Sequence, residues 1–116
     1  MRRDLSGIAR MAATTITSIQ RGIVFLMADW SGGARWAYPR LVAFLKEHGI
    51  ASEELHVLNV DDHPELYNMP ELSGKIHGWG EALVVKAGRI VLFTRLGKDQ
   101  PLIQEHCDQL LRVYVG

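Results

Sequence analysis

The stretch Met27–Pro39, MADWSGGARWAYP, joins two segments whose hydrophobic patterns differ. Residues 22–28 are apolar or glycine at every position, which is typical of a strand buried on both faces of a sheet. Residues 34–48 instead repeat their apolar side chains every three or four positions, which predicts a helix that Gly49 can end. The quoted stretch therefore indicates a turn from a buried strand into an amphipathic helix.

The rest of the chain continues this alternation of elements. We expect a helix over 4–20, a second buried strand within 54–62, a short broken helix over 63–78, a hairpin over 81–97 that turns at 86–88, and a last helix. Asp99 is expected to cap that last helix, with Pro101 in its first turn. Its predicted apolar stripe contains Leu102, Ile103, His106, Leu110 and Val113.

This order predicts an α/β fold with a mixed central β-sheet of about four strands and helices on both faces. The 116 residues fit a single domain, 1–116, in which the placement of the N-terminal helical segment 1–21 is left open. Functional residues in such folds gather beyond the carboxyl ends of parallel strands, and the turn after residue 28 lies at such an end.

The charge and the cysteine content limit which partners and which compartment can be expected. Thirteen basic and thirteen acidic side chains cancel, which gives no reason to expect nucleic acid or an acidic membrane as a partner. The best apolar run, 23–28, is too short to span a bilayer. A single cysteine, Cys107, excludes an internal disulfide. We expect a soluble, cytoplasmic protein without a cofactor.

Three segments, in the right order, resemble thioredoxin. The segment 28–39, ADWSGGARWAYP, is similar to the thioredoxin motif A-E-W-C-G-P-C-K-x-x-x-P, and Pro39 follows Trp30 at the spacing of the motif's proline. The segment 58–64, LNVDDHP, resembles L-N-I-D-x-N-P, and 78–90, GWGEALVVKAGRI, resembles G-I-P-T-L-L-L-F-K-N-G-E-V. The resemblance implies a thioredoxin-like fold from about residue 22 to the C-terminus.

The departures from thioredoxin fall on its chemistry. Dithiol exchange needs an attacking thiolate and a resolving thiol, and those positions hold Ser31 and Ala34. Phe25 stands where the family has a buried acid, and Gly80 where it has a cis-proline, so a cis peptide is not expected there. The segment 64–80 is also four residues longer than usual. Dithiol–disulfide activity is therefore predicted to be absent.

Several residues allow a structural and a functional interpretation. Ser31 is expected to be a helix N-cap rather than a nucleophile. The pair Gly32 and Gly33 is expected to form a tight turn with positive φ, the alternative being an anion cradle. Asp61 and Asp62 are expected to cap a turn rather than bind a cation or do acid–base work.

The remaining candidates concern metal and thiol chemistry. Cys107 is expected to be a small buried hydrophobe, the alternative being a lone redox sensor. The five histidines show no metal-binding spacing, and adjacent residues in the sequence EHCD do not share a helix face, so no metal site is predicted.

Three tryptophans, at positions 30, 36 and 79, suggest an aromatic patch for protein recognition at one rim of the fold. We therefore predict a redox-inactive thioredoxin-like module that binds an unidentified protein or peptide, in a chaperone-like, accessory or self-associating role. The predicted degenerate active site and binding rim consists of Trp30, Ser31, Gly32, Gly33, Ala34, Trp79 and Gly80. The alternative is an enzyme that uses the thiol of Cys107, or Ser31 with a histidine.

Overall fold

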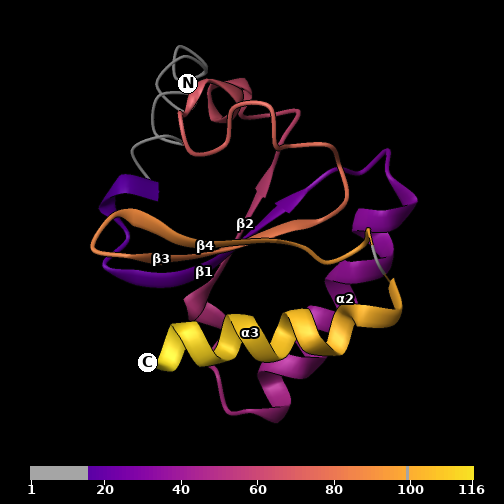
Figure 1. Ribbon diagram of the computed structural model, residues 1–116, viewed down its shortest axis with the longest axis vertical. Coiled ribbons are helices and arrows are strands. Elements are labelled where there is room, and N and C mark those ends of the chain that lie inside the picture. The colour runs from indigo at the N-terminus through magenta and orange to yellow at the C-terminus, as the bar shows by residue number, and fades with distance from the viewer. Residues whose placement is uncertain (1–15, 99) are drawn as a thin grey trace, which may run out of the picture.

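The computed structural model describes residues 16–98 and 100–116, with the side chain of Glu65 left out. The elements follow the chain in the order drawn in Figure 1. They are β1 (Arg21–Met27), α2 (Gly32–Glu47), η1 (Ser52–Glu54), β2 (Leu55–Asn59), η2 (Pro64–Asn68), β3 (Glu81–Lys86), β4 (Arg89–Arg95), η3 (Gln100–Leu102) and α3 (Ile103–Val115). The strand, turn and helix predicted around residues 27–39 are therefore confirmed as β1 and α2.

The four strands form one mixed sheet in the order β2-β1-β3-β4. Strand β1 runs parallel to β2, with Met27 opposite Asn59, and antiparallel to β3, with Leu26 opposite Glu81. The predicted mixed sheet is thus confirmed. Because of this register, the ends of β1 and β2 and the beginning of β3 all lie at one end of the sheet, to which the arrowheads of β1 and β2 point in Figure 1.

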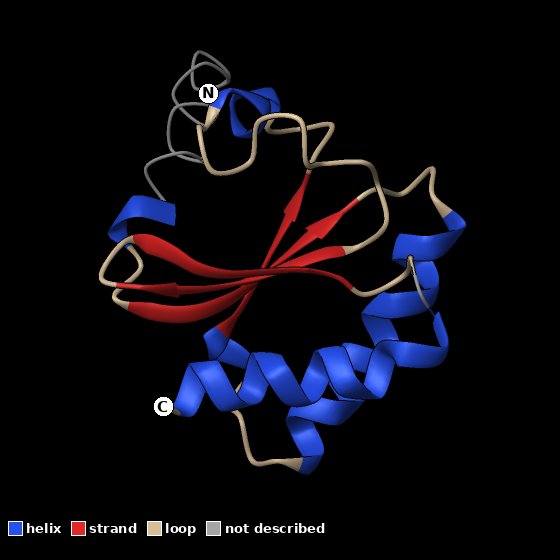
Figure 2. Ribbon diagram, viewed as in Figure 1, coloured by secondary structure: helices blue, strands red, loops and turns tan. Residues whose placement is uncertain are grey.

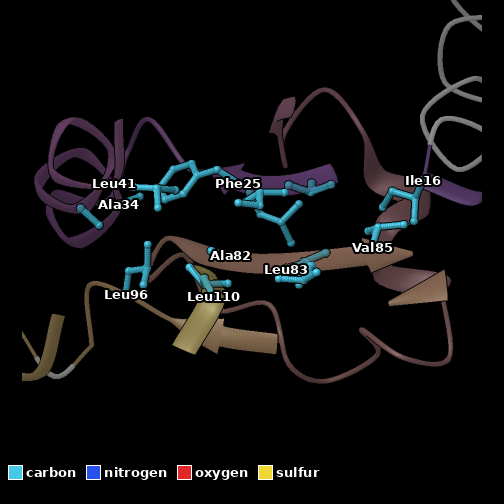
Figure 3. Packing of buried hydrophobic residues seen from close by; sticks show 14 of the residues in the cluster. Ile16, Phe25, Ala34, Leu41, Ala82, Leu83, Val85, Leu96 and Leu110 are labelled. Carbon is cyan, nitrogen blue, oxygen red and sulfur yellow. The ribbon is translucent and has the colours of Figure 1, made fainter. Parts of the chain in front are cut away.

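Helical segments cover both faces of the sheet, but unequally. The long helices α2 and α3 lie on one face, and η2 with its connecting segments lies on the other (Figure 2). Side chains of β1 alternate between these layers. Phe25 stacks on Tyr38 of α2 with 5.4 Å between ring centroids, and Figure 3 shows Phe25 extending toward Ala34 and Leu41.

The N-terminal half differs from expectation in two places. Of the helix predicted over 4–20, residues 1–15 lie outside the described residues; 16–18 are helical, and Ile16 and Ile19 are buried as predicted. Strand β2 was predicted to be buried, which is wrong, since none of its residues is fully buried. It is an edge strand that pairs only with β1, and its Val57 is 42% exposed. The broken helix predicted over 63–78 is confirmed as η2 followed by turns.

The predicted hairpin is confirmed as β3 and β4, joined by Ala87 and Gly88 with φ of 53° and 74°. Two positive φ values are what a two-residue type I′ turn requires.

The last helix is shifted from its prediction. Asp99 lies outside the described residues, Pro101 lies in η3, and α3 begins only at Ile103. The fully packed side chains of α3 belong to Cys107, Leu110 and Tyr114, whereas Leu102 is exposed. Of the predicted stripe, Leu110 is buried, and Ile103 and Val113 are partly buried against the core, whereas buried Tyr114 was not included in it. Tyr114 was missed because it is held by tertiary partners: Arg21 lies over its ring, and its hydroxyl donates to Glu54.

Candidate functional site

The thioredoxin-like motif lies at the end of the sheet where β1 and β2 finish and β3 begins. Three segments meet there: the turn 28–31 before α2, the turn 60–63 after β2, and the loop 77–80 before β3. Residues 31 and 48 positions apart in the sequence are thereby brought into contact, in the Trp30–Asp61 and Trp30–Gly78 pairs described below.

The motif residues at the start of α2 have structural roles. Ser31 is the N-cap: its backbone is extended and its Oγ accepts a hydrogen bond from Ala34 N–H at 3.4 Å, which confirms the N-cap interpretation. Gly32 and Gly33 are the first residues of the helix and neither has positive φ, so the tight-turn interpretation is wrong. Gly33 instead allows the close approach of Trp79, because a Cβ there would lie 3.0 Å from Cε3 of that ring.

Trp30 is an exposed side chain with a fixed position. Its ring is 59% exposed, yet its Nε1–H donates to Oδ1 of Asp61 at 3.2 Å. Gly78 lies directly against the same ring, since a Cβ there would be 2.4 Å from Cη2. Gly78 also has a φ of 80°, a backbone conformation that favours glycine. The rotation of the Trp30 ring is therefore restricted by two contacts from distant segments.

Trp79 is 39% exposed and packs on Gly33 at the start of α2. Its backbone is fully paired within the chain: the N–H donates to Oε2 of Glu81 at 3.3 Å, and the C=O accepts from Gly97 N–H at 2.7 Å. Trp36 differs from the other two tryptophans, because it is half-buried against the core and its ring is covered by the Arg40 guanidinium at 4.2 Å. The exposed aromatic surface at this end is thus built from two of the three tryptophans.

Gly80 and Ala34 lie beneath this surface and are both buried. Gly80 has a φ of 77°, and no peptide bond within residues 16–98 and 100–116 is cis, as expected for a position without proline. A Cβ on Gly80 would lie 3.1 Å from the Phe25 ring and 3.2 Å from Cα of Ala34. These residues bring the loop 77–80 close to α2, and they contribute shape rather than exposed side chains.

Glu81 and Tyr67 are two residues that the sequence analysis missed. Glu81 is completely buried, and its Oε2 also accepts from His77 N–H at 2.9 Å, so one carboxylate oxygen fixes the loop 77–79. Its Oε1 has no hydrogen-bond partner among the described residues. Burial, and then the negative charges of Asp61 and Glu81, raise the pKa of Tyr67. An acidic residue at the start of an apolar strand was the only sequence sign of this arrangement.

Cys107 lies in α3 and is buried, as the small-hydrophobe interpretation predicts. Burial, assisted by the neighbouring Asp108, raises the pKa of the Cys107 thiol to about 11. A reactive thiol needs the opposite, an exposed sulfur with a lowered pKa. Within the described part of the chain, no group of three His, Cys, Asp or Glu side chains has the arrangement of a metal site.

The fold has well-defined counterparts among solved structures. Plasmodium falciparum thioredoxin matches with a TM-score of 0.62 at 18% identity, over 86% of this chain and 91% of that one. Fasciola hepatica thioredoxin matches with a TM-score of 0.60 at 18% identity, over 95% and 91%. Thioredoxin NaTrxh from Nicotiana alata has a TM-score of 0.60 at 14% identity, over 90% and 85%. No family model matches the chain, and no curated protein sequence does either.

The chain therefore has the thioredoxin fold, and the fold that the resemblance implied is confirmed. With a single cysteine it has no C-x-x-C pair. None of the helices in the described ranges is both long and apolar enough to cross a membrane.

Proposed function

We propose that this protein is a redox-inactive thioredoxin-fold module that binds a partner protein or peptide at the end of the sheet carrying Trp30 and Trp79. Ser31 and Ala34 stand at the two thiol positions of the motif, and neither side chain can form a disulfide. The only sulfhydryl, on Cys107, is buried in α3. These features support a role in binding, chaperone-like or accessory, and a reducing compartment such as the cytoplasm suits the single free thiol.

An exposed tryptophan held in place by its own chain is the strongest support for binding at this end. Tryptophan is enriched among the residues that dominate interface energies, because it buries a large area with few rotatable bonds. Trp30 is more than half exposed but is fixed by Asp61 and Gly78. Little side-chain entropy remains to be lost when a partner covers the ring, so more of the buried area contributes to affinity.

Recognition at this surface depends on side chains. The backbone N–H and C=O of Trp79 are already paired within the chain, so they are not free to pair with an extended peptide. The rim that remains is formed by the rings of Trp30 and Trp79, with Gly32 exposed between the turn and the helix. Ser31 and Gly33 shape this rim, and Ala34 and Gly80 support it from below.

Two measurements test the two halves of the proposal. In an insulin-reduction assay with dithiothreitol, the protein is expected to add nothing to the rate of dithiothreitol alone, whereas a redox-active thioredoxin in a parallel reaction accelerates it. Acceleration by this protein would contradict redox inactivity.

Binding is tested with Trp30→Ala beside Val91→Ala, which truncates another exposed apolar side chain, on β4. Immobilised wild-type protein is used to select ten-residue peptides from a random library. The Trp30 variant is expected to lose at least about tenfold in affinity for selected peptides, as a truncated interface tryptophan does, and the Val91 variant to keep it. Equal affinities of both variants would place the interface elsewhere.

A further inference from the structure

The rim has a local charge that the whole protein lacks. The chain is neutral overall, yet residues 59–74 contain four acidic side chains and neither lysine nor arginine. The turn after β2 within this segment holds Asp61 and Asp62, and Asp61 is hydrogen-bonded to Trp30. A partner that approaches the exposed Trp30 ring from this turn therefore meets the carboxylate of Asp61.

A hydrogen-bond network places two of the carboxylates beside Trp30. The side chain of Asn59 donates from Nδ2 to Oδ2 of Asp29 at 2.7 Å, and its Oδ1 accepts from the backbone N–H of Asp61 at 2.9 Å. Asp61 in turn accepts from Trp30 Nε1–H. Asp29 and Asp61 are both exposed, so their negative charges face solvent next to an exposed indole ring.

A third carboxylate contributes from beneath the rim. Glu81 is fully buried, and its Oε1 has no hydrogen-bond partner among residues 16–98 and 100–116. Its Oε2 holds the loop whose Gly78 lies against the Trp30 ring. Besides burial, which is the larger cause, the negative charges of Asp61 and Glu81 both raise the pKa of Tyr67.

We infer that the partner segment is basic, and that a lysine or arginine side chain of it lies on the Trp30 ring and pairs with the carboxylate of Asp61. This inference rests on the proposed function. An exposed aromatic ring with a carboxylate at its edge offers a cation both a π face and an ion pair. An acidic peptide or a nucleic-acid phosphate would be repelled by the same groups.

The substitution Asp61→Asn tests this inference without disturbing Trp30. Asparagine keeps an oxygen that can accept from Trp30 Nε1–H, but it removes the negative charge. Glu47→Gln is the matched control, since it removes one exposed acid at the far end of α2. The probes are ten-residue peptides selected by the wild-type protein, resynthesised with lysine, arginine, leucine or glutamate at each position in turn, and measured by fluorescence anisotropy.

At one position of the peptide, lysine or arginine is expected to bind at least about fivefold more tightly than glutamate, and this preference is expected to weaken at high salt. Asp61→Asn should remove most of the preference, and Glu47→Gln should leave it intact. If peptides bind but show no basic preference, or if Asp61→Asn retains it, the inference is overturned and the proposed function stands. If wild-type protein selects no peptide at all, both are overturned. If the Asp61 variant does not fold, the salt dependence of peptide binding by the wild-type protein decides instead. A basic preference that does not weaken at high salt overturns the inference.

Discussion

Replacing Gly78 with alanine tests the contact that positions Trp30. At a φ of 80°, backbone strain in an L-residue destabilises the folded state by about 1–2 kcal/mol. Alanine also lowers the conformational entropy of the unfolded chain, which offsets about 0.4–1 kcal/mol of this cost. The new Cβ would also lie 2.4 Å from Cη2 of Trp30, so the ring must move and its hydrogen bond to Asp61 must break. That bond contributes about 1 kcal/mol. We expect Gly78→Ala to lower the free energy of unfolding by about 2 kcal/mol.

Two other glycines separate the backbone strain from the ring contact. Gly74 and Gly49 have φ values of 75° and 74°, and a Cβ at either would meet nothing within 4 Å. Gly74→Ala and Gly49→Ala are therefore expected to cost only the net backbone strain, about 1 kcal/mol each. In a Trp30→Ala background, Gly78→Ala should fall to the same value, which gives a coupling energy of about 1 kcal/mol or more between positions 78 and 30.

The free energies are measured by urea unfolding followed by circular dichroism, and the ring is followed by its indole N–H resonance in ¹⁵N-labelled protein. Gly78→Ala should shift the Trp30 indole resonance, whereas Gly74→Ala should leave it in place. If Gly78→Ala and Gly74→Ala cost the same, or if the cost of Gly78→Ala is unchanged without Trp30, the ring does not rest on Gly78 and the reasoning is refuted.

Three further outcomes are expected. Glu81→Gln should lower the free energy of unfolding by about 1–3 kcal/mol and speed amide hydrogen exchange at His77 and Trp79, because a neutral amide is a weaker acceptor than the buried carboxylate. Unchanged exchange at these two amides would contradict this. The Cys107 thiol should resist Ellman's reagent until the protein unfolds. Burial raises the pKa of this thiol from 9.0 to about 11, so between these values only the unfolded chain ionises, and the free energy of unfolding should fall as the pH rises through this window. Cys107→Ala should remove that part of the pH dependence in urea unfolding. The same pH dependence in wild type and variant would argue against this account. Ser31→Ala should cost about 1 kcal/mol by urea unfolding through loss of the α2 N-cap, and a cost near zero would mean that the 3.4 Å bond contributes nothing.

Much of the fold could be predicted from the sequence because the deciding patterns are local. The apolar run of β1 and the 3.6-residue repeat of α2 each report how that segment is buried, whatever it packs against. The turn at Ala87 and Gly88 was similarly visible, since a two-residue connection between apolar runs restricts the backbone by itself. The N-cap role of Ser31 follows from its place directly before a helix.

The errors arise where a residue's environment is set by distant segments. Strand β2 contains enough apolar residues for a central strand, but its position at the sheet edge depends on which strands pair, and no local pattern encodes that. Tyr114 was left out of the predicted stripe of α3 because it is held by Arg21 and Glu54, which lie far away in the sequence. Gly32 and Gly33 were expected to need positive φ, whereas Gly33 allows the close approach of Trp79.

The sequence by itself determined that the chain forms a strand, a capped helix and a hairpin in this order, and that two thiols of a thioredoxin motif are replaced by Ser31 and Ala34. These features depend on residue identity and on spacing along the chain. Only the tertiary structure decided that Trp30 is held by Asp61 and Gly78, and that Glu81 is buried beneath the loop 77–79. The register of β1 with β2 and β3 creates those contacts, and register depends on burial summed over the whole sheet rather than on any one segment.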